Sequence, residues 1–313
     1  MTNLSEFTFL SSDGKTQLHG MLWEPEGVAV RAVLQICHGV AEHIARYDGF
    51  ARALNEQGIV VAGHDHLGHG KSLPEGGTPV YFGEGNTWNT VVDDIYILHQ
   101  RLKQRYPDVP LCIMGHSMGS FLTRTYLIRY PGTVKAAVIM GTGWQPQAAI
   151  TGGLALANAI AAVSGENATS ELVTELAFGS YNKLFAPNRT KVDWLSADES
   201  NVDDYIADPL CGADATVGLF RQMLHGIRFN QRQSHLRQMD REMPVLFVAG
   251  DKDPVGSCGK GVRQTYDAFR AAGMRDCTLK LYPGLRHEIL NEKAYTADIT
   301  KNIEAWLLSR LEK

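Results

Sequence analysis

The sequence predicts an α/β fold in which a mainly parallel sheet carries helices on both faces and a helical cap follows the sixth strand. Segments with the apolar pattern of strands alternate with segments of helical periodicity over residues 31–141 and again over 244–311. Such alternation is typical of a parallel sheet whose crossover helices cover both faces. A Gly-His-Ser-Met-Gly motif at 115–119 joins one predicted strand directly to one predicted helix. Residues 145–235 interrupt the alternation, which indicates an inserted unit.

The individual elements follow from these patterns. A β-hairpin is predicted over residues 6–25, because apolar residues alternate on both sides of a Ser-Asp-Gly-Lys turn at 12–15. Further strands are predicted at 31–37, 59–63, 110–115, 134–141, 244–250 and 277–282. Helices are predicted at 47–57, 87–106, 118–130, 260–272 and 292–311. Residues 1–144 and 236–313 then form the core, and residues 145–235 form the cap, or lid.

Composition excludes several classes of protein. The 313 residues are 44% hydrophobic and 20% charged, with a net charge of −4, so the chain lacks the basic surface that nucleic-acid binding requires. The first residues show no basic region followed by an apolar stretch, and no signal peptide is expected. The five cysteines are scattered and odd in number, without a C-x-x-C pair, which favours a reduced, cytoplasmic setting.

Ser117 is the candidate nucleophile. It is the serine of the G-x-S-x-G motif at 115–119, which follows the apolar run 110–114 and precedes a segment of helical periodicity at 120–130. This strand, tight turn and helix form the context of the nucleophile elbow of an α/β-hydrolase. The helix N-terminus behind the serine favours the negative charge that develops during acyl transfer.

A serine is activated by a general base that a third group must orient. His287 follows the predicted strand 277–282 and is the candidate base. Asp251 and Asp253 both follow the predicted strand 244–250, and the order Ser, Asp, His is that of the α/β-hydrolases. Asp253 is favoured because it stands further out, before a proline that fixes the loop. Asp251 stays the alternative, its other role being to hold the turn.

Two backbone N–H groups are candidates for the oxyanion hole. In this fold, one donor is the residue after the nucleophile, here Met118, and the second comes from the loop after an early strand. The predicted strand 31–37 is followed by His38, Gly39 and Val40. Val40 is the expected second donor, because the preceding glycine lets the backbone turn inward.

Several segments resemble one known family. Residues 38–47 closely resemble the H-G-x-x-E-H-x-x-R-Y signature of monoglyceride lipases and bacterial lysophospholipases, in the serine aminopeptidase-like branch of the α/β-hydrolases. The His-Asp-His-Leu-Gly-His-Gly-Lys-Ser run at 64–72 is similar to a second segment of that family. The resemblance spans roughly 7–143 and 240–311 and leaves 145–235 uncovered. It implies a triad and two oxyanion donors at Ser117, Asp253, His287, Val40 and Met118.

The resemblance implies a serine carboxylic ester hydrolase that cleaves a small lipid ester, of the monoacylglycerol or lysophospholipid type, through an acyl-enzyme. No metal or organic cofactor is expected, and transient contact of the cap with a membrane surface fits a lipid substrate. An amidase or aminopeptidase could use the same triad, since the cap carries acidic residues that could bind an α-amine. A ligand-binding protein without activity is disfavoured, because such proteins usually show a broken triad.

Residues of the cap are expected to determine which substrate is chosen. The run at 150–163 is small and apolar, and it is too short to cross a bilayer, which takes about 20 apolar residues. It predicts a helix packed on the core, and the alternative is that one face of this helix lines an acyl-chain tunnel or touches lipid. The candidate substrate contacts are Leu154, Leu156, Phe178 and Trp194.

A metal site is the rival interpretation of the histidines at 64–69. The His-x-His-x-x-His spacing resembles that of metal ligands, and Asp65 stands among them. A zinc site would not account for the serine motif, the late aspartate and His287 together. The segment is therefore predicted to be a tight loop after the strand 59–63, with histidines bonded to backbone and no metal.

Overall fold

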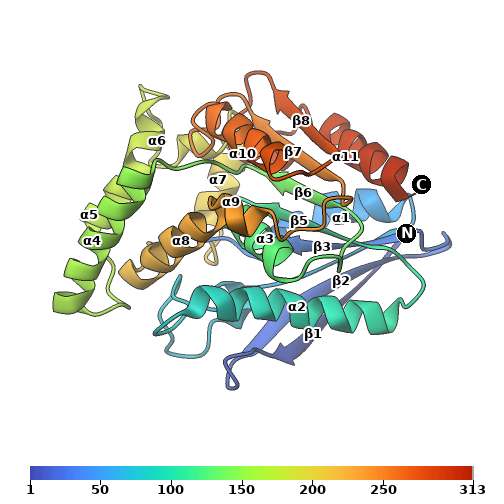
Figure 1. Cartoon of the computed structure of the whole chain (residues 1–313), viewed down its shortest axis with the longest axis horizontal. Coiled ribbons are helices and arrows are strands. Elements are labelled where there is room, and N and C mark those ends of the chain that lie inside the picture. The colour runs from blue at the N-terminus through green and yellow to red at the C-terminus, as the bar shows by residue number, and fades with distance from the viewer. Residues whose placement is uncertain (312–313) are drawn as a thin grey trace.

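One sheet of eight strands forms the centre of the molecule, in the order β1-β2-β4-β3-β5-β6-β7-β8 (Figure 1). The computed structural model describes residues 1–311, except for the side chains of residues 171, 176 and 177. β2 pairs antiparallel with β1 and with β4, and the other neighbouring strands are parallel. The strands are β1 (Thr2–Leu10), β2 (Gln17–Pro25), β3 (Ala32–Cys37), β4 (Ile59–His64), β5 (Leu111–His116), β6 (Ala137–Met140), β7 (Val245–Gly250) and β8 (Cys277–Tyr282). The predicted mainly parallel sheet is confirmed.

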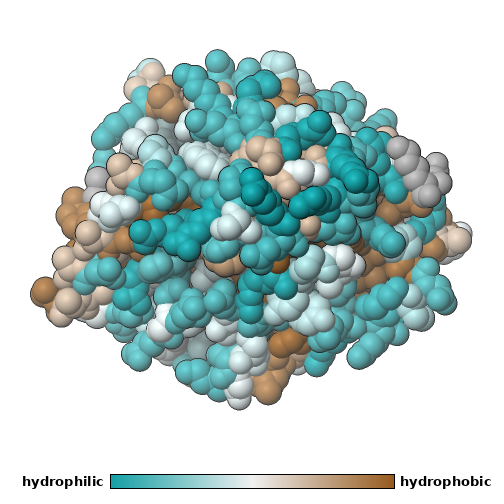
Figure 2. Space-filling view, viewed as in Figure 1, coloured by the Kyte–Doolittle hydropathy of each residue, from teal (hydrophilic) through white to brown (hydrophobic). Residues whose placement is uncertain are grey.

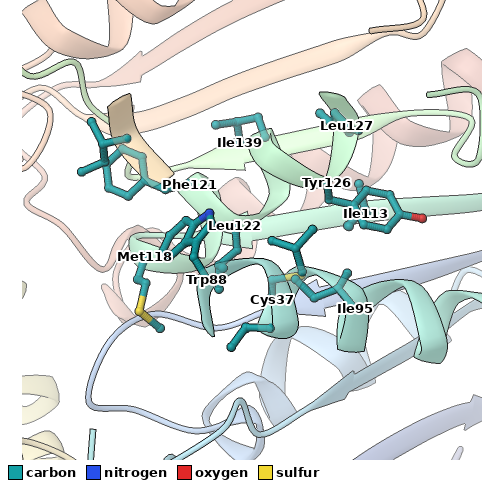
Figure 3. Close-up of a cluster of buried hydrophobic side chains, with 14 of the residues drawn as sticks. Cys37, Trp88, Ile95, Ile113, Met118, Phe121, Leu122, Tyr126, Leu127 and Ile139 are labelled. Carbon is teal, nitrogen blue, oxygen red and sulfur yellow. The ribbon is translucent and has the colours of Figure 1, made fainter. Parts of the chain in front are cut away.

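Helices cover both faces of this sheet, because alternate residues of the buried central strands enter two different cores. Val33 of β3 packs on one side, in the core that Figure 3 shows around Trp88 and Phe121. Leu34 packs in the opposite core. The first core is covered by α2 (Thr87–Arg105), α3 (Met118–Arg129) and α10 (Lys260–Ala271), and the second by α1 (Asp48–Asn55) and α11 (Thr296–Leu311).

The insertion between β6 and β7 is helical, as predicted. Its helices are α4 (Gln147–Ser164), α5 (Glu171–Thr174), α6 (Ser180–Lys183), α7 (Glu199–Ala207), α8 (Val217–Asn230) and α9 (Gln233–Leu236), with a π-helical turn at Glu175–Gly179. α4 lies far from the sheet, at the left in Figure 1, and packs on α8. α8 also reaches the core, because Asn230 donates to the Phe121 carbonyl at 2.8 Å. The insertion thus has an outer part around α4 and an inner part, α8, that joins it to α3.

Helix α4 is apolar but mostly exposed. Three of its side chains, Ile150, Leu154 and Ala157, are buried, at the spacing of one helix face. Figure 2 shows apolar side chains along the left edge of the molecule, where α4 lies in Figure 1. Among the described residues, α4 is the one helix long and apolar enough to cross a membrane, with 18 residues, a mean hydropathy of 1.3 and 17% of them buried. A cap or core helix passes the same test, so length and composition alone do not make α4 a membrane span.

Candidate active site

Ser117 lies at the apex of a sharp turn between β5 and α3. Its backbone torsions, φ 54° and ψ −123°, are strained for a residue with a side chain. The Ser117 N–H donates to the Met140 carbonyl on the neighbouring strand at 3.1 Å, which holds the turn. A Cβ atom at Gly119 would lie 2.0 Å from the Cys37 carbonyl oxygen, so only glycine lets α3 approach β3 this closely. The sequence motif therefore has the geometry of a nucleophile elbow.

His287 and Asp253 form a buried pair. The Nδ1 atom of His287, in the loop after β8, lies 2.9 Å from Oδ2 of Asp253, and the two side chains are 2% and 0% exposed. The other carboxylate oxygen accepts the Val255 N–H at 2.9 Å. Because Nδ1 donates to the carboxylate, Nε2 is left as the basic nitrogen, and it has no hydrogen-bond partner among residues 1–311. The ring of His116, which precedes Ser117, lies 4.6 Å from the His287 ring between centroids.

The structure separates the two candidate aspartates. Asp251 Oδ1 accepts the N–H of Gly284 at 2.8 Å, and the Asp251 N–H donates to the Tyr282 carbonyl at 3.0 Å. Asp251 thus holds the loop that leads to His287, whereas the carboxylate of Asp253 contacts the imidazole itself.

The two predicted oxyanion donors lie on either side of the elbow. Met118 is the first residue of α3, so its N–H has no partner within the helix. Val40 lies in the turn after β3, and its N–H donates to no other backbone group in the described part of the chain. A Cβ atom at Gly39 would come within 3.1 Å of the Ser117 Cβ, so this turn passes directly beside the serine.

The carboxylate of Glu42 holds the turn that carries Gly39 and Val40. Its Oε1 atom accepts the Gly39 N–H at 2.5 Å and the Tyr47 hydroxyl at 3.1 Å, and it lies 3.2 Å from Nδ1 of His116. Burial alone would raise the pKa of Glu42, but the hydrogen bond from His116 and the charge of Arg46 hold it well below its usual range. An ionised carboxylate is the better acceptor for all of these donors.

Arg46 extends this network to the loop of His287 and to the cap. Its Nη1 atom lies 3.1 Å from Oε2 of Glu42, and both of its terminal nitrogens bind Glu288, at 2.7 and 2.9 Å. Glu288 directly follows His287 and also accepts from the Asn201 amide of α7 at 2.8 Å. One guanidinium therefore connects three parts of the molecule: the turn of residues 38–40 after β3, here called the oxyanion turn, the loop that carries His287, and a cap helix. A cavity of about 270 Å³ borders this network.

Two of the four predicted cap residues, Trp194 and Phe178, lie on the side of the cap that faces His287. The ring of Trp194 lies 5.1 Å from the His287 ring between centroids, and Phe178 stacks on Trp194 at 6.4 Å. Tyr181, which sequence reasoning missed, packs edge-on against Trp194 at 5.2 Å. These three aromatic side chains form a wall beside the imidazole.

The other two predicted cap residues, Leu154 and Leu156, lie on α4. Leu154 is buried in the core that includes α8, at 5% exposure. Leu156 lies two positions further along the helix, which turns its side chain about 200° away, and it is half-buried.

The histidines at the end of β4 and in the loop after it pack against His38 of the oxyanion turn. The rings of His38 and His66 stack at 4.2 Å between centroids, and His64 and His69 contact them at 5.1 and 5.4 Å. His38 Nδ1 lies 2.8 Å from the Gly39 carbonyl, and its Nε2 accepts the His66 N–H at 3.0 Å. Burial lowers the pKa of His64 and of His69 to about 3, so both rings are neutral near pH 7.

The fold and its relatives define a serine hydrolase of the α/β-hydrolase class. Residues 28–294 match the family described as serine aminopeptidase, S33, and the chain belongs to this family. A monoacylglycerol lipase of Mycolicibacterium smegmatis is 30% identical over 312 residues, covering 98% of each chain. A monoglyceride lipase of Mus musculus is 28% identical over 96% of this chain and 90% of its own length. The structure of a highly thermostable carboxyl esterase from Bacillus coagulans, in complex with glycerol, superposes with a TM-score of 0.92 at 26% identity, covering 99% of this chain and 100% of that one.

Proposed function

We propose that the protein hydrolyses a small lipid ester, of the monoacylglycerol or lysophospholipid type, with Ser117, His287 and Asp253 as its catalytic triad. The observation that carries the proposal is the buried His287–Asp253 hydrogen bond of 2.9 Å, with a free Nε2, beside a strained serine turn. The names of the relatives, monoacylglycerol and monoglyceride lipases at 30% and 28% identity, support the substrate class.

The proposed reaction proceeds in two halves. The Ser117 oxygen attacks the ester carbonyl carbon while His287 Nε2 takes the hydroxyl proton, and Asp253 holds the ring and stabilises the imidazolium. The N–H groups of Val40 and Met118 bind the oxyanion. The bond to the leaving alcohol then breaks, and His287 gives its proton to the alcohol. Water, deprotonated by His287, attacks the acyl-enzyme and releases the carboxylic acid.

The cap is proposed to bind the acyl chain and to meet the lipid surface. The wall of Phe178, Tyr181 and Trp194 is apolar and contacts the base, so it can border the first carbons of an acyl chain. Helix α4 carries no charged side chain between residues 147 and 164, and its Val163 is 88% exposed. When such an uncharged, exposed helix contacts lipid headgroups and acyl chains, no charged side chain has to be removed from water. We propose transient contact of α4 with a membrane surface.

A cytoplasmic location is part of the same proposal. The five cysteines, at positions 37, 112, 211, 258 and 277, are all free thiols. Free thiols persist in the reducing cytoplasm and tend to be oxidised outside it.

An aminopeptidase is the second candidate, because the family description names that activity. Such an enzyme needs an unpaired carboxylate to bind the substrate α-amine. Glu288, next to the base, is neutralised by Arg46 through two hydrogen bonds. In the cap, Asp193 accepts from Thr190 and Asp208 is bound to His43. These carboxylates are already engaged, which favours the ester substrate.

A substrate panel tests the proposal. Monoacylglycerols with acyl chains of increasing length, a lysophosphatidylcholine and an aminoacyl p-nitroanilide are compared by kcat/KM, with Ser117→Ala as the blank. We expect ester hydrolysis that rises with chain length to an optimum, and no release of nitroaniline above the blank. Faster cleavage of the nitroanilide than of any ester would replace the lipase assignment with that of an aminopeptidase.

A further inference from the structure

We propose that His43, Asp208 and Cys211 form a binding site for a divalent cation of the zinc type, between the oxyanion turn and the cap. One ligand atom from each of these residues lies within 4.8 Å of the other two. His43 lies in the loop after β3, and the other two residues lie in the turn after α7. The histidines at 64, 66 and 69 do not form such a group in the described part of the chain. The site is separate from the triad and from the proposed reaction.

The turn after α7 holds its two ligands in a defined geometry. Asp208 Oδ1 accepts the Leu210 N–H at 2.9 Å, and the Cys211 N–H donates to the Asp208 carbonyl at 3.0 Å. With one oxygen used by its own turn, the carboxylate presents Oδ2 to Nε2 of His43, at 2.8 Å. Ligands oriented in this way by backbone groups lose little freedom when an ion binds.

Two further hydrogen bonds fasten this turn to the loop of His43. The Gly212 N–H donates to the Ala41 carbonyl at 3.0 Å, and the Tyr205 hydroxyl donates to the same oxygen at 3.0 Å. The three ligands are therefore held together by contacts that do not depend on the ion.

The donor set matches the chemistry of zinc. An imidazole nitrogen, a carboxylate oxygen and a thiolate sulfur are the usual zinc ligands, and three of them leave a fourth position for water. The negative charges of one carboxylate and one thiolate balance a divalent cation. The Asp208 side chain is 28% exposed, which gives the ion a path from solvent.

An ion at this site would bind one loop of the core and one turn of the cap at once. Because it binds the folded chain and not the unfolded one, it should raise the melting temperature further as the free ion concentration increases above its Kd. It should also restrain the part of the cap that lies over the oxyanion turn.

Cobalt(II) is the probe for this site, because a bound thiolate gives it a charge-transfer absorption band that oxygen and nitrogen ligands do not. The full chain, reduced and freed of metal, is titrated with Co²⁺ near neutral pH. We expect one Co²⁺ per chain, a thiolate band that saturates with it, displacement by Zn²⁺ and a rise in melting temperature with Zn²⁺. The conservative variant Cys211→Ser should lose the thiolate band and the Zn²⁺-dependent rise.

The matched control is Cys258→Ser, which removes the exposed thiol of the chain and leaves the proposed ligands intact. It should keep the band and the stoichiometry. The proposal is overturned if wild type shows no thiolate band at saturating Co²⁺, or if the band survives in Cys211→Ser. Melting of both variants without metal shows whether they are folded, and none of these readouts depends on ester hydrolysis.

Discussion

The core edge and the outer cap are held by opposite kinds of contact. At the core edge, buried polar groups fix one another: Asp253 orients His287, and Glu42 and Arg46 brace the oxyanion turn against the loop of the base. Helix α4 of the cap is held mainly through three buried apolar side chains, and most of its other residues are exposed. Each group assigned to the reaction is thus fixed by several buried polar contacts. The helix assigned to the acyl chain is fixed by a few apolar contacts.

The contacts at the core edge should also contribute more to stability, one by one, than those of α4. Removing one partner of a buried ion pair costs about 3–5 kcal/mol, because the other charge stays buried and unpaired. Burying one leucine side chain stabilises by about 1.5–3 kcal/mol, and α4 has few such contacts. Changes on α4 should therefore leave the triad undisturbed, and substitutions in the two regions should have separable effects.

The largest expected effect among substitutions at the core edge is at Asp253. Asp253→Asn should lower kcat by up to about 10⁴-fold, because an amide stabilises the wrong tautomer of His287. Asp251→Asn is the matched control. It keeps an oxygen that can accept the Gly284 N–H and removes only the charge, so it should cost far less. Steady-state kinetics on one ester measure both, and equal losses would remove the distinction between the two aspartates.

A substitution at Glu42 tests whether its hydrogen-bond network positions a backbone N–H donor of the oxyanion hole. Glu42→Gln keeps the size of the side chain but removes the charge that faces the Gly39 N–H, His116 and Arg46. We expect kcat to fall by about 10²–10³-fold, as for loss of one oxyanion donor, with KM little changed. A matching rise in KM with unchanged kcat would show that Glu42 shapes substrate binding instead.

The buried histidines make the core sensitive to acid. The pKa values of His64 and His69 are lowered to about 3 in the folded chain, so below pH 6.5 the unfolded chain binds protons that the folded chain does not. The contribution of these two histidines to stability should be constant above that pH and fall by roughly 1.4 kcal/mol per pH unit for each of them as pH drops toward 4.

Urea unfolding at several pH values between 7 and 4 measures this slope. Both ring nitrogens of His64 lack partners among the described residues, so His64→Leu removes one titrating group without breaking a hydrogen bond. The slope should then decrease by the share of one histidine. An unchanged slope in this variant would show that His64 does not carry it.

The smallest effect is expected in the cap. If α4 borders the acyl chain, Leu156→Asn should flatten the rise of kcat/KM with chain length, which is worth about 0.8 kcal/mol per buried methylene. Acetyl esters should be unaffected. Val163→Asn, at an 88% exposed position of the same helix, is the control. Leu154 is the poorer site for this test, because it packs in the core and its substitution costs stability. An unchanged profile in Leu156→Asn would leave α4 without a role in chain selection.

Local patterns predicted most of the fold and the pieces of the site. The alternation of strand-like and helix-like spacing of apolar residues located the sheet, and the serine motif located the elbow. Both patterns depend on residues that are neighbours in the chain. The predicted strand 134–141 proved shorter, as β6 covers Ala137–Met140. The pairing of Arg46 with Glu288 joins residues 242 positions apart and leaves no local pattern, and the sequence did not show it.

The buried face of α4 was equally hidden from sequence. Its residues are small or apolar all round, so periodicity could not tell Leu154, which packs on the core, from Leu156, which does not. Tyr181 gave no sign of its place beside Trp194, because that contact depends on how the cap folds over the loop of the base.

Covalent labelling tests the central proposal, an acyl-enzyme on Ser117, most directly. The purified protein is treated with a fluorophosphonate and its intact mass is measured beside that of Ser117→Ala. We expect stoichiometric addition of one phosphonyl group to the wild-type chain, located on the peptide that contains Ser117, and no addition to the folded variant. Undiminished labelling of Ser117→Ala would contradict the assignment of this serine as the nucleophile.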